Sequence, residues 1–171
     1  QSFELETVLK KRVKRRLLEE IKSISNLKIS IQTIRQGQAL GLGHAILCAK
    51  PIVQKEPFAV VLPDMLIRKI NEKNDLLELK KEFETSGKSQ ILLGKIQKKD
   101  VSSYGIVKIQ NKLIQSIVEK PSLKKAPSNL FVIGRYIFEN DFFKYLKNNK
   151  TSKSGEFELT SAIQSFIKDN N

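Results

Sequence analysis

Two short segments after apolar runs carry side chains that could do chemistry. Asp64 ends "FAVVLPD" over residues 58–64, and Glu119 with Lys120 stands in "VEKP". A carboxylate at the carboxyl edge of an α/β sheet lies where such sheets bind ligands, and it can hold Mg²⁺ together with phosphate oxygens. Because adjacent strand residues point to opposite faces, Glu119 could hold sugar hydroxyls while Lys120 reaches a phosphate. The alternatives are a turn cap at Asp64 and a solvated strand end at Glu119 and Lys120.

Glycines mark two further candidate positions. The segment "RQGQALGLGHAILCA", residues 35–49, has three glycines in seven residues and then becomes apolar at helical spacing. Such a loop either lets the backbone approach a ligand closely or makes a tight turn between a strand and a helix. Gly105 in "SYGIV" has the same two interpretations, a β-bulge or a backbone N–H brought close to a ligand hydroxyl.

His44 and Cys48 lie four residues apart on a predicted helix, which is the spacing of two metal ligands. No third ligand accompanies them, so packing is the favoured interpretation. Cys48 is the single cysteine of the chain, which excludes an internal disulfide framework and predicts a cytoplasmic protein.

The charge of the chain is strongly positive, with a formal net charge of +13. A nucleic acid, an anionic small molecule or a lysine-rich composition without a function would each explain it. Lysines are spread along the whole chain, and the dense basic run 9–16 has leucine and valine at core positions without interleaved aromatics. We therefore expect a solvated helix face and no nucleic-acid partner. No apolar run approaches the roughly 20 residues that span a bilayer, so we expect no membrane segment.

Hydrophobic periodicity predicts alternating helices and strands in the first half of the chain. Residues 58–64 form a continuous apolar run, typical of a strand that is buried on both faces. Asp75 is the predicted N-cap of a helix that runs to about Thr85 and ends at Gly87. The other elements expected here are a helix over 4–24, a strand over 27–34 and a helix from about Gly43 that Pro51 limits.

The second half is richer in strands. Strands are expected at 89–96, 104–109, 113–120 and 130–138, with helices near 139–148 and 156–168. The pattern predicts an α/β fold whose sheet is mostly parallel and has helices on both faces. Because three strand candidates follow one another without a helix, we expect an inserted β-rich portion made of hairpins.

In order, the chain reads "RQGQALGLGHAILCA", "FAVVLPD", "YGIVKI", "VEKP", "APSNLFVIGRYIF" and "GEFELTSAI". This ordered set resembles the bacterial UTP–glucose-1-phosphate uridylyltransferases of the sugar-nucleotide pyrophosphorylase superfamily. The resemblance extends from the first predicted helix to the last. It implies a single nucleotidyltransferase domain over 1–171, with a Rossmann-like mixed sheet flanked by helices.

The resemblance also implies a reaction, in which UTP and glucose 1-phosphate give UDP-glucose and pyrophosphate with Mg²⁺. It assigns the uracil to Gln36 and Gly41, the metal to Asp64, the glucose hydroxyls to Gly105 and Glu119, the sugar phosphate to Lys120, and a backbone contact with the sugar to Val132. Asp64 and Lys120 are then the catalytic residues. They would screen two anions while a phosphate oxygen attacks the α-phosphorus in line.

The chain departs from the family pattern at both ends. Neither the "GxGTR" phosphate loop and its downstream lysine nor a C-terminal segment with a second metal-binding aspartate occurs here. We therefore expect a domain that is incomplete at both ends and does not catalyse alone, whereas the complete protein should be a homo-oligomer, a dimer or a tetramer. The alternatives are a nucleotidyltransferase that uses dTTP, ATP or CTP, a basic nucleic-acid-binding module, and a domain whose site has decayed.

Overall fold

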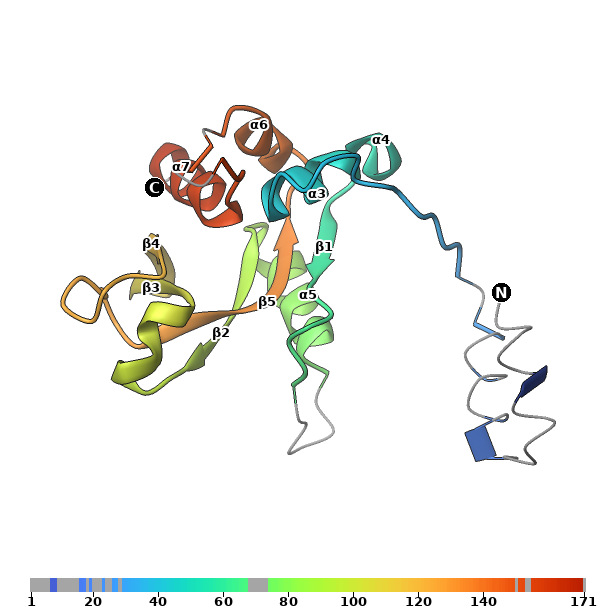
Figure 1. Ribbon diagram of the computed structural model, residues 1–171, viewed down its shortest axis with the longest axis horizontal. Coiled ribbons are helices and arrows are strands. Elements are labelled where there is room, and N and C mark those ends of the chain that lie inside the picture. The colour runs from blue at the N-terminus through green and yellow to red at the C-terminus, as the bar shows by residue number, and fades with distance from the viewer. Residues whose placement is uncertain are drawn as a thin grey trace. The chain divides into compact units, whose positions relative to one another are not determined.

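The computed structural model describes residues 7–8, 16–17, 19, 23, 26–27, 29–67, 74–149, 151–152 and 155–170 (Figure 1). The chain divides into two compact units, Gln1–Ile34 and Arg35–Asn171, and each is considered by itself. That residues 1–171 act as a single domain stays a prediction.

Two of the predicted elements, a helix over 4–24 and a strand over 27–34, belong to the first unit. Within the predicted helix 4–24, the described residues 7, 8, 16, 17, 19 and 23 are helical, and the others, with most of the basic run 9–16, lie outside the described residues. The strand predicted at 27–34 is wrong, because residues 29–34 have no regular secondary structure. Ile29 and Ile31 are 62% and 79% exposed. Alternating apolar residues make a stable strand only when a neighbouring strand pairs with them.

The second unit is built on a five-stranded sheet in which every described strand pair is antiparallel. Its strands are β1 (Phe58–Val61), β2 (Gln90–Lys95), β3 (Gly105–Gln110), β4 (Leu113–Glu119) and β5 (Leu130–Phe138). The predicted α/β class with a sheet flanked by helices is confirmed, but the expectation that the sheet is mostly parallel is wrong. The physical reason is β5, which lies between β1 and β2 and runs against both, so that these two parallel strands never pair with each other.

The inserted β-rich portion is the hairpin of β3 and β4. The two residues of its turn, Asn111 and Lys112, have φ values of 51° and 63°. Positive φ at both positions is the type I′ geometry, whose twist matches the twist of paired strands. A short 3₁₀ helix, η1 (Lys98–Ser103), precedes the hairpin and was not predicted.

The described residues of the second unit form five α-helices: α3 (Leu42–Cys48), α4 (Lys50–Val53), α5 (Asp75–Ser86), α6 (Phe142–Lys147) and α7 (Leu159–Asn170). The single helix predicted up to Pro51 is instead α3 followed by α4, with Pro51 in the first turn of α4. Proline is tolerated there because a residue in the first turn has no intrahelical partner for its N–H. No described helix has the length and apolar character needed to cross a membrane.

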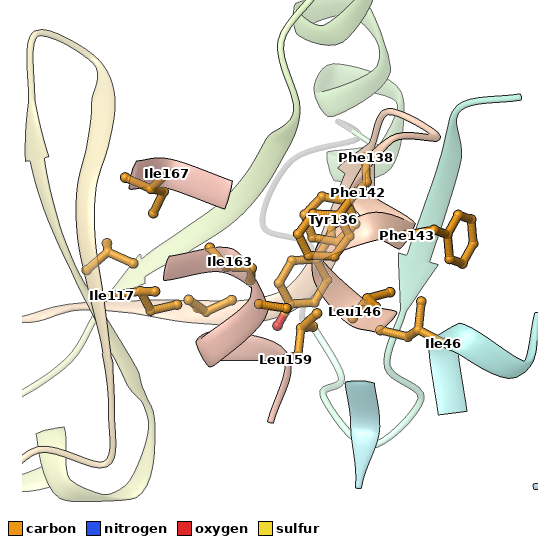
Figure 2. Close-up of a cluster of buried hydrophobic side chains, with 13 residues drawn as sticks. Ile46, Ile117, Tyr136, Phe138, Phe142, Phe143, Leu146, Leu159, Ile163 and Ile167 are labelled. Atoms are coloured by element: carbon orange, nitrogen blue, oxygen red, sulfur yellow. The ribbon is translucent and has the colours of Figure 1, made fainter. Parts of the chain in front are cut away.

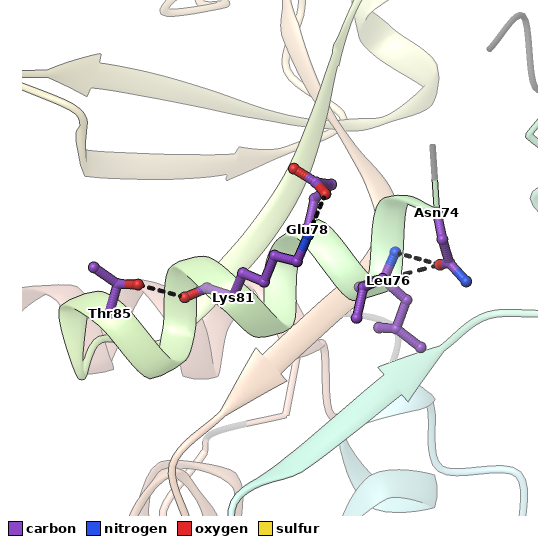
Figure 3. A network of polar contacts seen from close by, with 6 residues as sticks. Asn74, Leu76, Glu78, Lys81 and Thr85 are labelled. Carbon is purple, nitrogen blue, oxygen red and sulfur yellow. Dashed lines mark hydrogen bonds and ion pairs between the residues drawn. The ribbon is translucent and has the colours of Figure 1, made fainter. Parts of the chain in front are cut away.

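Helix α5 begins one residue away from the prediction. The Asn74 side-chain oxygen accepts hydrogen bonds from the backbone N–H groups of Leu76 and Leu77, at 3.1 and 3.3 Å, so Asn74 and not Asp75 is the N-cap (Figure 3). Asp75 instead places its negative charge in the first turn, where it favours the helix dipole. Gly87 ends the helix with φ 64°, as predicted.

The core lies where the sheet meets α6 and α7 (Figure 2). Tyr136 and Phe138 of β5 stack with centroids 5.5 Å apart, and Phe138 stacks on Phe142 of α6 at 3.9 Å. Burying each such side chain stabilises the fold by roughly 1.5–3 kcal/mol. Ile137 points to the other face, where it lines a hollow with residues of α5. Strand β1 alternates between half-buried and exposed side chains, with Val61 47% exposed, so the predicted burial of β1 on both faces is wrong.

Candidate active site

The strand pairing along β5 is interrupted at the residues that matter for function. One edge of β5 pairs with β2. On the other edge β1 pairs with residues 135–138 and β3 with residues 130–131, and none of the described strands pairs there with residues 132–133. The ends of β1 and β3 therefore approach this interval from opposite sides.

Three of the residues predicted to bind the sugar lie in a row across this interruption. Gly105 pairs directly with Glu119 in the β3–β4 hairpin. Ile106 pairs with Phe131, and extending that antiparallel register by one residue places Gly105 opposite Val132. Glu119, Gly105 and Val132 thus succeed one another across β4, β3 and β5. The side chain of Val132 is only 7% exposed and belongs to the core, which leaves its backbone for a ligand.

A hollow of about 290 Å³ opens beside Glu119, between β4 and the first turns of α7. The side chain of Gln164 ties the two elements together, because its oxygen accepts the backbone N–H of Ile117 at 2.9 Å. A Cβ atom on Gly105 would lie 3.4 Å from Glu119 Oε2 and 3.2 Å from the Thr160 methyl group. Glu119 and Thr160, which both line the hollow, therefore lie next to Gly105. The hydroxyl oxygen of Thr160 is buried without a hydrogen-bond partner.

Besides burial, the negative charge of Glu119 contributes to the pKa of a neighbouring phenol, that of Tyr136. Burial raises the pKa of Tyr136, which is 5% exposed, and the negative charge of Glu119 raises it further. The Tyr136 phenol consequently stays neutral near the Glu119 carboxylate.

Lys120 follows Glu119 at the point where the chain leaves β4. Its φ is 40°, and its backbone N–H donates a hydrogen bond to the carbonyl oxygen of Tyr104 at 3.1 Å. The left-handed backbone breaks the alternation of the strand, and the Lys120 side chain is exposed. An exposed ammonium on a long side chain next to Glu119 is well suited to reach an anionic group of a ligand.

Asp64 lies in the turn that follows β1, on the opposite side of the interruption from Gly105. Its side chain is exposed. Arg135 of β5 holds this turn, because its guanidinium donates hydrogen bonds to the carbonyl oxygens of Leu62 and Met65, at 2.7 and 2.9 Å. The position of Asp64 is therefore set by a side chain from the central strand. Sequence reasoning missed Arg135, although "GRY" stands inside one of the quoted segments.

Gln36 and Gly41, the predicted base-binding residues, contact each other. The Gln36 amide nitrogen lies 3.2 Å from the Gly41 carbonyl oxygen and 2.8 Å from Nδ1 of His44. The loop between them is thus closed by a side chain, which orients the Gln36 amide. The Sγ of Cys48 lies 3.9 Å from both ring nitrogens of His44.

The glycines of the 35–49 segment have a structural reason that the sequence did not reveal. Gly43 donates its N–H to the Phe157 carbonyl oxygen, and Phe157 donates its N–H to the Leu40 carbonyl oxygen, both at 2.8 Å. A Cβ on Gly43 would lie 2.7 Å from Phe157 O, and one on Gly41 would lie 3.0 Å from Phe157 N. Gly41 also has φ 93°. These glycines allow another segment of the chain to approach closely, in addition to any approach by a ligand.

Residues 155–160 therefore connect the two halves of the site. Phe157 is hydrogen-bonded to Leu40 and Gly43 of the segment 36–43, called the glycine loop below. Three residues later, Thr160 lies against Gly105. The only signal in the sequence was the segment "GEFELTSAI", to which no role was assigned.

Asp64 is the residue that the resemblance assigns to a metal ion, and its carboxylate is exposed. Within the part of the chain that the structure describes, no group of three or more histidine, cysteine, aspartate or glutamate residues could hold a metal ion. The ring of His44 lies 2.8 Å from the Gln36 amide nitrogen, and its centroid lies 6.1 Å from that of Phe157. That His44 and Cys48 serve packing stays a prediction. A single exposed carboxylate fits a Mg²⁺ ion that completes its shell with water and substrate phosphates, the arrangement this ion prefers.

The sequence of this chain is similar to those of known nucleotidyl transferases. A family model described as "Nucleotidyl transferase" matches residues 3–171. The UTP–glucose-1-phosphate uridylyltransferase of Haemophilus influenzae is 43% identical over 98% of this chain and 60% of the relative. The chain thus spans about three fifths of the length of the curated relatives it matches.

Solved structures show the same fold. The UTP-bound UGPase of Acinetobacter baumannii superposes with a TM-score of 0.83 at 38% identity, over 100% of this chain and 60% of that one. A UDP-glucose pyrophosphorylase complexed with UDP-glucose gives a TM-score of 0.82 at 34% identity, over 87% of this chain and 59% of that one. Since the family model covers nearly the whole chain and the sheet and helices match these structures, the chain belongs to the nucleotidyl transferase family.

Proposed function

We propose that this chain carries the sugar-nucleotide site of a UTP–glucose-1-phosphate uridylyltransferase, which forms UDP-glucose and pyrophosphate. The observation that supports this most is the convergence of residues far apart in sequence. Glu119, Gly105 and Val132 succeed one another across the sheet, and the turn of Asp64 lies across the interruption of β5. Within residues 155–160, Thr160 lies against Gly105 and Phe157 is hydrogen-bonded to residues 40 and 43 of the loop that follows Gln36.

The sugar would be held by groups of complementary hydrogen-bonding character. The Glu119 carboxylate accepts hydrogen bonds from glucose hydroxyls, and charge-assisted bonds of this kind are the stronger ones. The absent side chain of Gly105 leaves room for a hydroxyl beside its backbone. Val132 pairs with Leu93 of β2 on one edge, and its other edge, where none of the described strands pairs, would provide a further contact. Gln36 and Gly41 would recognise the uracil through a carboxamide and a backbone group, without charge.

The chemical step brings two anions together, and two residues of this chain reduce their repulsion. Two unit charges 4 Å apart repel by about 4 kcal/mol at an intermediate dielectric. Lys120 would bind the phosphate of glucose 1-phosphate and align its oxygen with the α-phosphorus of UTP. Asp64 would hold Mg²⁺, which supplies positive charge to the phosphate oxygens when it is bound. The nucleophile is already anionic, so no strong general base is required.

Other expectations belong to the same proposal. A single domain, a homo-oligomeric and cytoplasmic protein, and the absence of a nucleic-acid partner are consistent with this function, and each stays a prediction.

Calorimetric titration with UDP-glucose tests the proposal. We expect the chain to bind UDP-glucose, and the Glu119→Gln variant to bind it at least tenfold more weakly, because an amide loses the charge-assisted bonds to the sugar hydroxyls. The matched control is Glu82→Gln on α5, whose side chain is exposed. Equal affinities of the Glu119→Gln and Glu82→Gln variants would contradict the proposed sugar site.

A further inference from the structure

We propose that His44 is a positioning residue that fixes the amide of Gln36 so that the carbonyl oxygen, and not the NH₂ group, is presented to the nucleotide base. Among pyrimidines, the chain would thereby select uracil and thymine, which carry an N–H at the contacted position, over cytosine. The inference rests on the proposed function, because it takes Gln36 as the base-contacting residue.

The orientation of the Gln36 amide follows from its two neighbours. The carbonyl oxygen of Gly41 can only accept hydrogen bonds, so the group 3.2 Å from it must be the NH₂ of Gln36. The NH₂ group has a second hydrogen, and the remaining partner, His44 Nδ1, lies 2.8 Å away. Both donors are then used, and the carbonyl oxygen of Gln36 is left with its lone pairs for a ligand.

The same reasoning fixes the tautomer of His44. Because Nδ1 accepts from Gln36, it carries no proton, and the ring proton is on Nε2. The ring is held in place by packing, since its centroid lies 6.1 Å from that of Phe157, in the segment that closes the glycine loop. His44 thus transmits the position of residues 155–160 to the amide of Gln36.

Base selectivity follows from this orientation. Uracil and thymine have an N–H group between their two carbonyl oxygens, whereas cytosine has an unprotonated ring nitrogen at the same position. A fixed Gln36 carbonyl oxygen accepts a hydrogen bond from the N–H group of uracil or thymine. In cytosine it would face the unprotonated nitrogen, which is also an acceptor, and both groups would be left without a partner. Without His44 the NH₂ group keeps only the longer contact, 3.2 Å from the Gly41 carbonyl oxygen, so the amide is held less firmly and can rotate more readily to present its NH₂ group, which would accommodate cytosine.

Nuclear magnetic resonance tests the orientation without any ligand. His44 is the single histidine of the chain, so its ring signals need no separate assignment. Long-range ¹H–¹⁵N correlations at neutral pH should show Nε2 protonated and Nδ1 unprotonated, and the Gln36 side-chain amide signals should shift in His44→Phe. A ring protonated at Nδ1 would overturn the inference, because that nitrogen would then donate to Gln36.

Titrations with UDP-glucose and CDP-glucose test the selectivity. The ratio of the two affinities should fall roughly tenfold in His44→Phe, which keeps a ring but has no acceptor; this factor corresponds to about 1.4 kcal/mol. Cys48→Ala, in which the contact of Gln36 with His44 is intact, should keep the wild-type ratio. An unchanged ratio in His44→Phe would overturn the inference.

The Gln36→Ala variant separates this failure from failure of the proposed function. If Gln36→Ala weakens UDP-glucose binding and His44→Phe leaves the ratio unchanged, Gln36 contacts the base without help from His44, and only the inference fails. If the wild-type chain does not bind UDP-glucose, or Gln36→Ala binds it equally well, the proposed base site fails and the inference with it.

Discussion

Replacing Gly43 by alanine should separate the glycine loop from residues 155–160. The new Cβ would lie 2.7 Å from the Phe157 carbonyl oxygen and 3.3 Å from its carbon. Both are backbone atoms, which cannot rotate away as the end of a side chain could. The Phe157 carbonyl must therefore move, and it is the acceptor of the Gly43 N–H bond at 2.8 Å.

The expected loss of stability can be estimated from these contacts. Overpacking costs about 1–3 kcal/mol, and weakening the hydrogen bond to Phe157 about 1 kcal/mol more. Because Gly43 lies in α3, alanine returns about 1 kcal/mol through its better helix propensity. The free energy of unfolding should fall by roughly 1–3 kcal/mol.

Urea denaturation followed by circular dichroism measures this change. Gly37→Ala is the matched control from the same loop, because a Cβ at Gly37 would meet nothing within 4 Å. We expect Gly37→Ala to change the free energy of unfolding by no more than about 0.5 kcal/mol. The reasoning would be refuted if the two variants were equally stable, since the close approach of Phe157 would then not require Gly43.

Three further predictions concern the elements that position the site. Arg135→Met should lower the free energy of unfolding by about 1–3 kcal/mol in urea denaturation, since two carbonyl oxygens of the Asp64 turn lose their donors. Arg135→Lys should recover only part of this loss, because an ammonium lacks the forked donors of a guanidinium. Full recovery of stability in Arg135→Lys would contradict this reasoning. The pKa of Tyr136 in the folded protein is raised above its ordinary value of 10.0, so with rising pH the phenol ionises in the unfolded state before it does so in the folded state. Above pH 10 the free energy of unfolding should therefore fall by about 1.4 kcal/mol per pH unit more in the wild type than in Tyr136→Phe. The same dependence on pH in both proteins would contradict this. Asn74→Ala should cost about 1 kcal/mol in the same denaturation assay and Asp75→Ala less than that, and the reverse order would restore Asp75 as the N-cap.

The sequence predicted the elements whose signals are local. Strand β5 was predicted with the bounds that the structure has, Leu130–Phe138, because its apolar run is long and bounded by polar segments. Gly87 was a reliable helix end for a similar reason, since a left-handed residue after a helix is a property of a few neighbouring residues.

The sequence failed where partners distant in the chain decide. Residues 29–34 alternate like a strand, but alternation says nothing about whether a neighbour exists to pair with them. The direction of β5 between β1 and β2 is likewise a matter of topology, and no periodicity distinguishes an antiparallel strand that is buried on both faces from a parallel one.

The residues of the candidate site show the same difference between local signals and contacts with distant parts of the chain. Asp64 and Glu119 were identified because they follow apolar strands, and the resemblance supplied Gln36, Gly41 and Val132. The residues that hold them, Arg135, His44 and Phe157, were missed because their roles depend on contacts across the fold. An arginine that binds carbonyl oxygens 70 and 73 residues away has no local signature.

The most direct test of the account is the footprint of UDP-glucose on the chain, measured as ¹⁵N chemical-shift changes of the backbone amides. The account predicts that the largest changes fall together on Gln36 to Gly43, Gly105, Glu119 to Lys120, Val132 and residues 157–160, with α5 unaffected. Changes confined to other elements, or no changes at millimolar ligand, would contradict the claim that these distant segments form one sugar-nucleotide site.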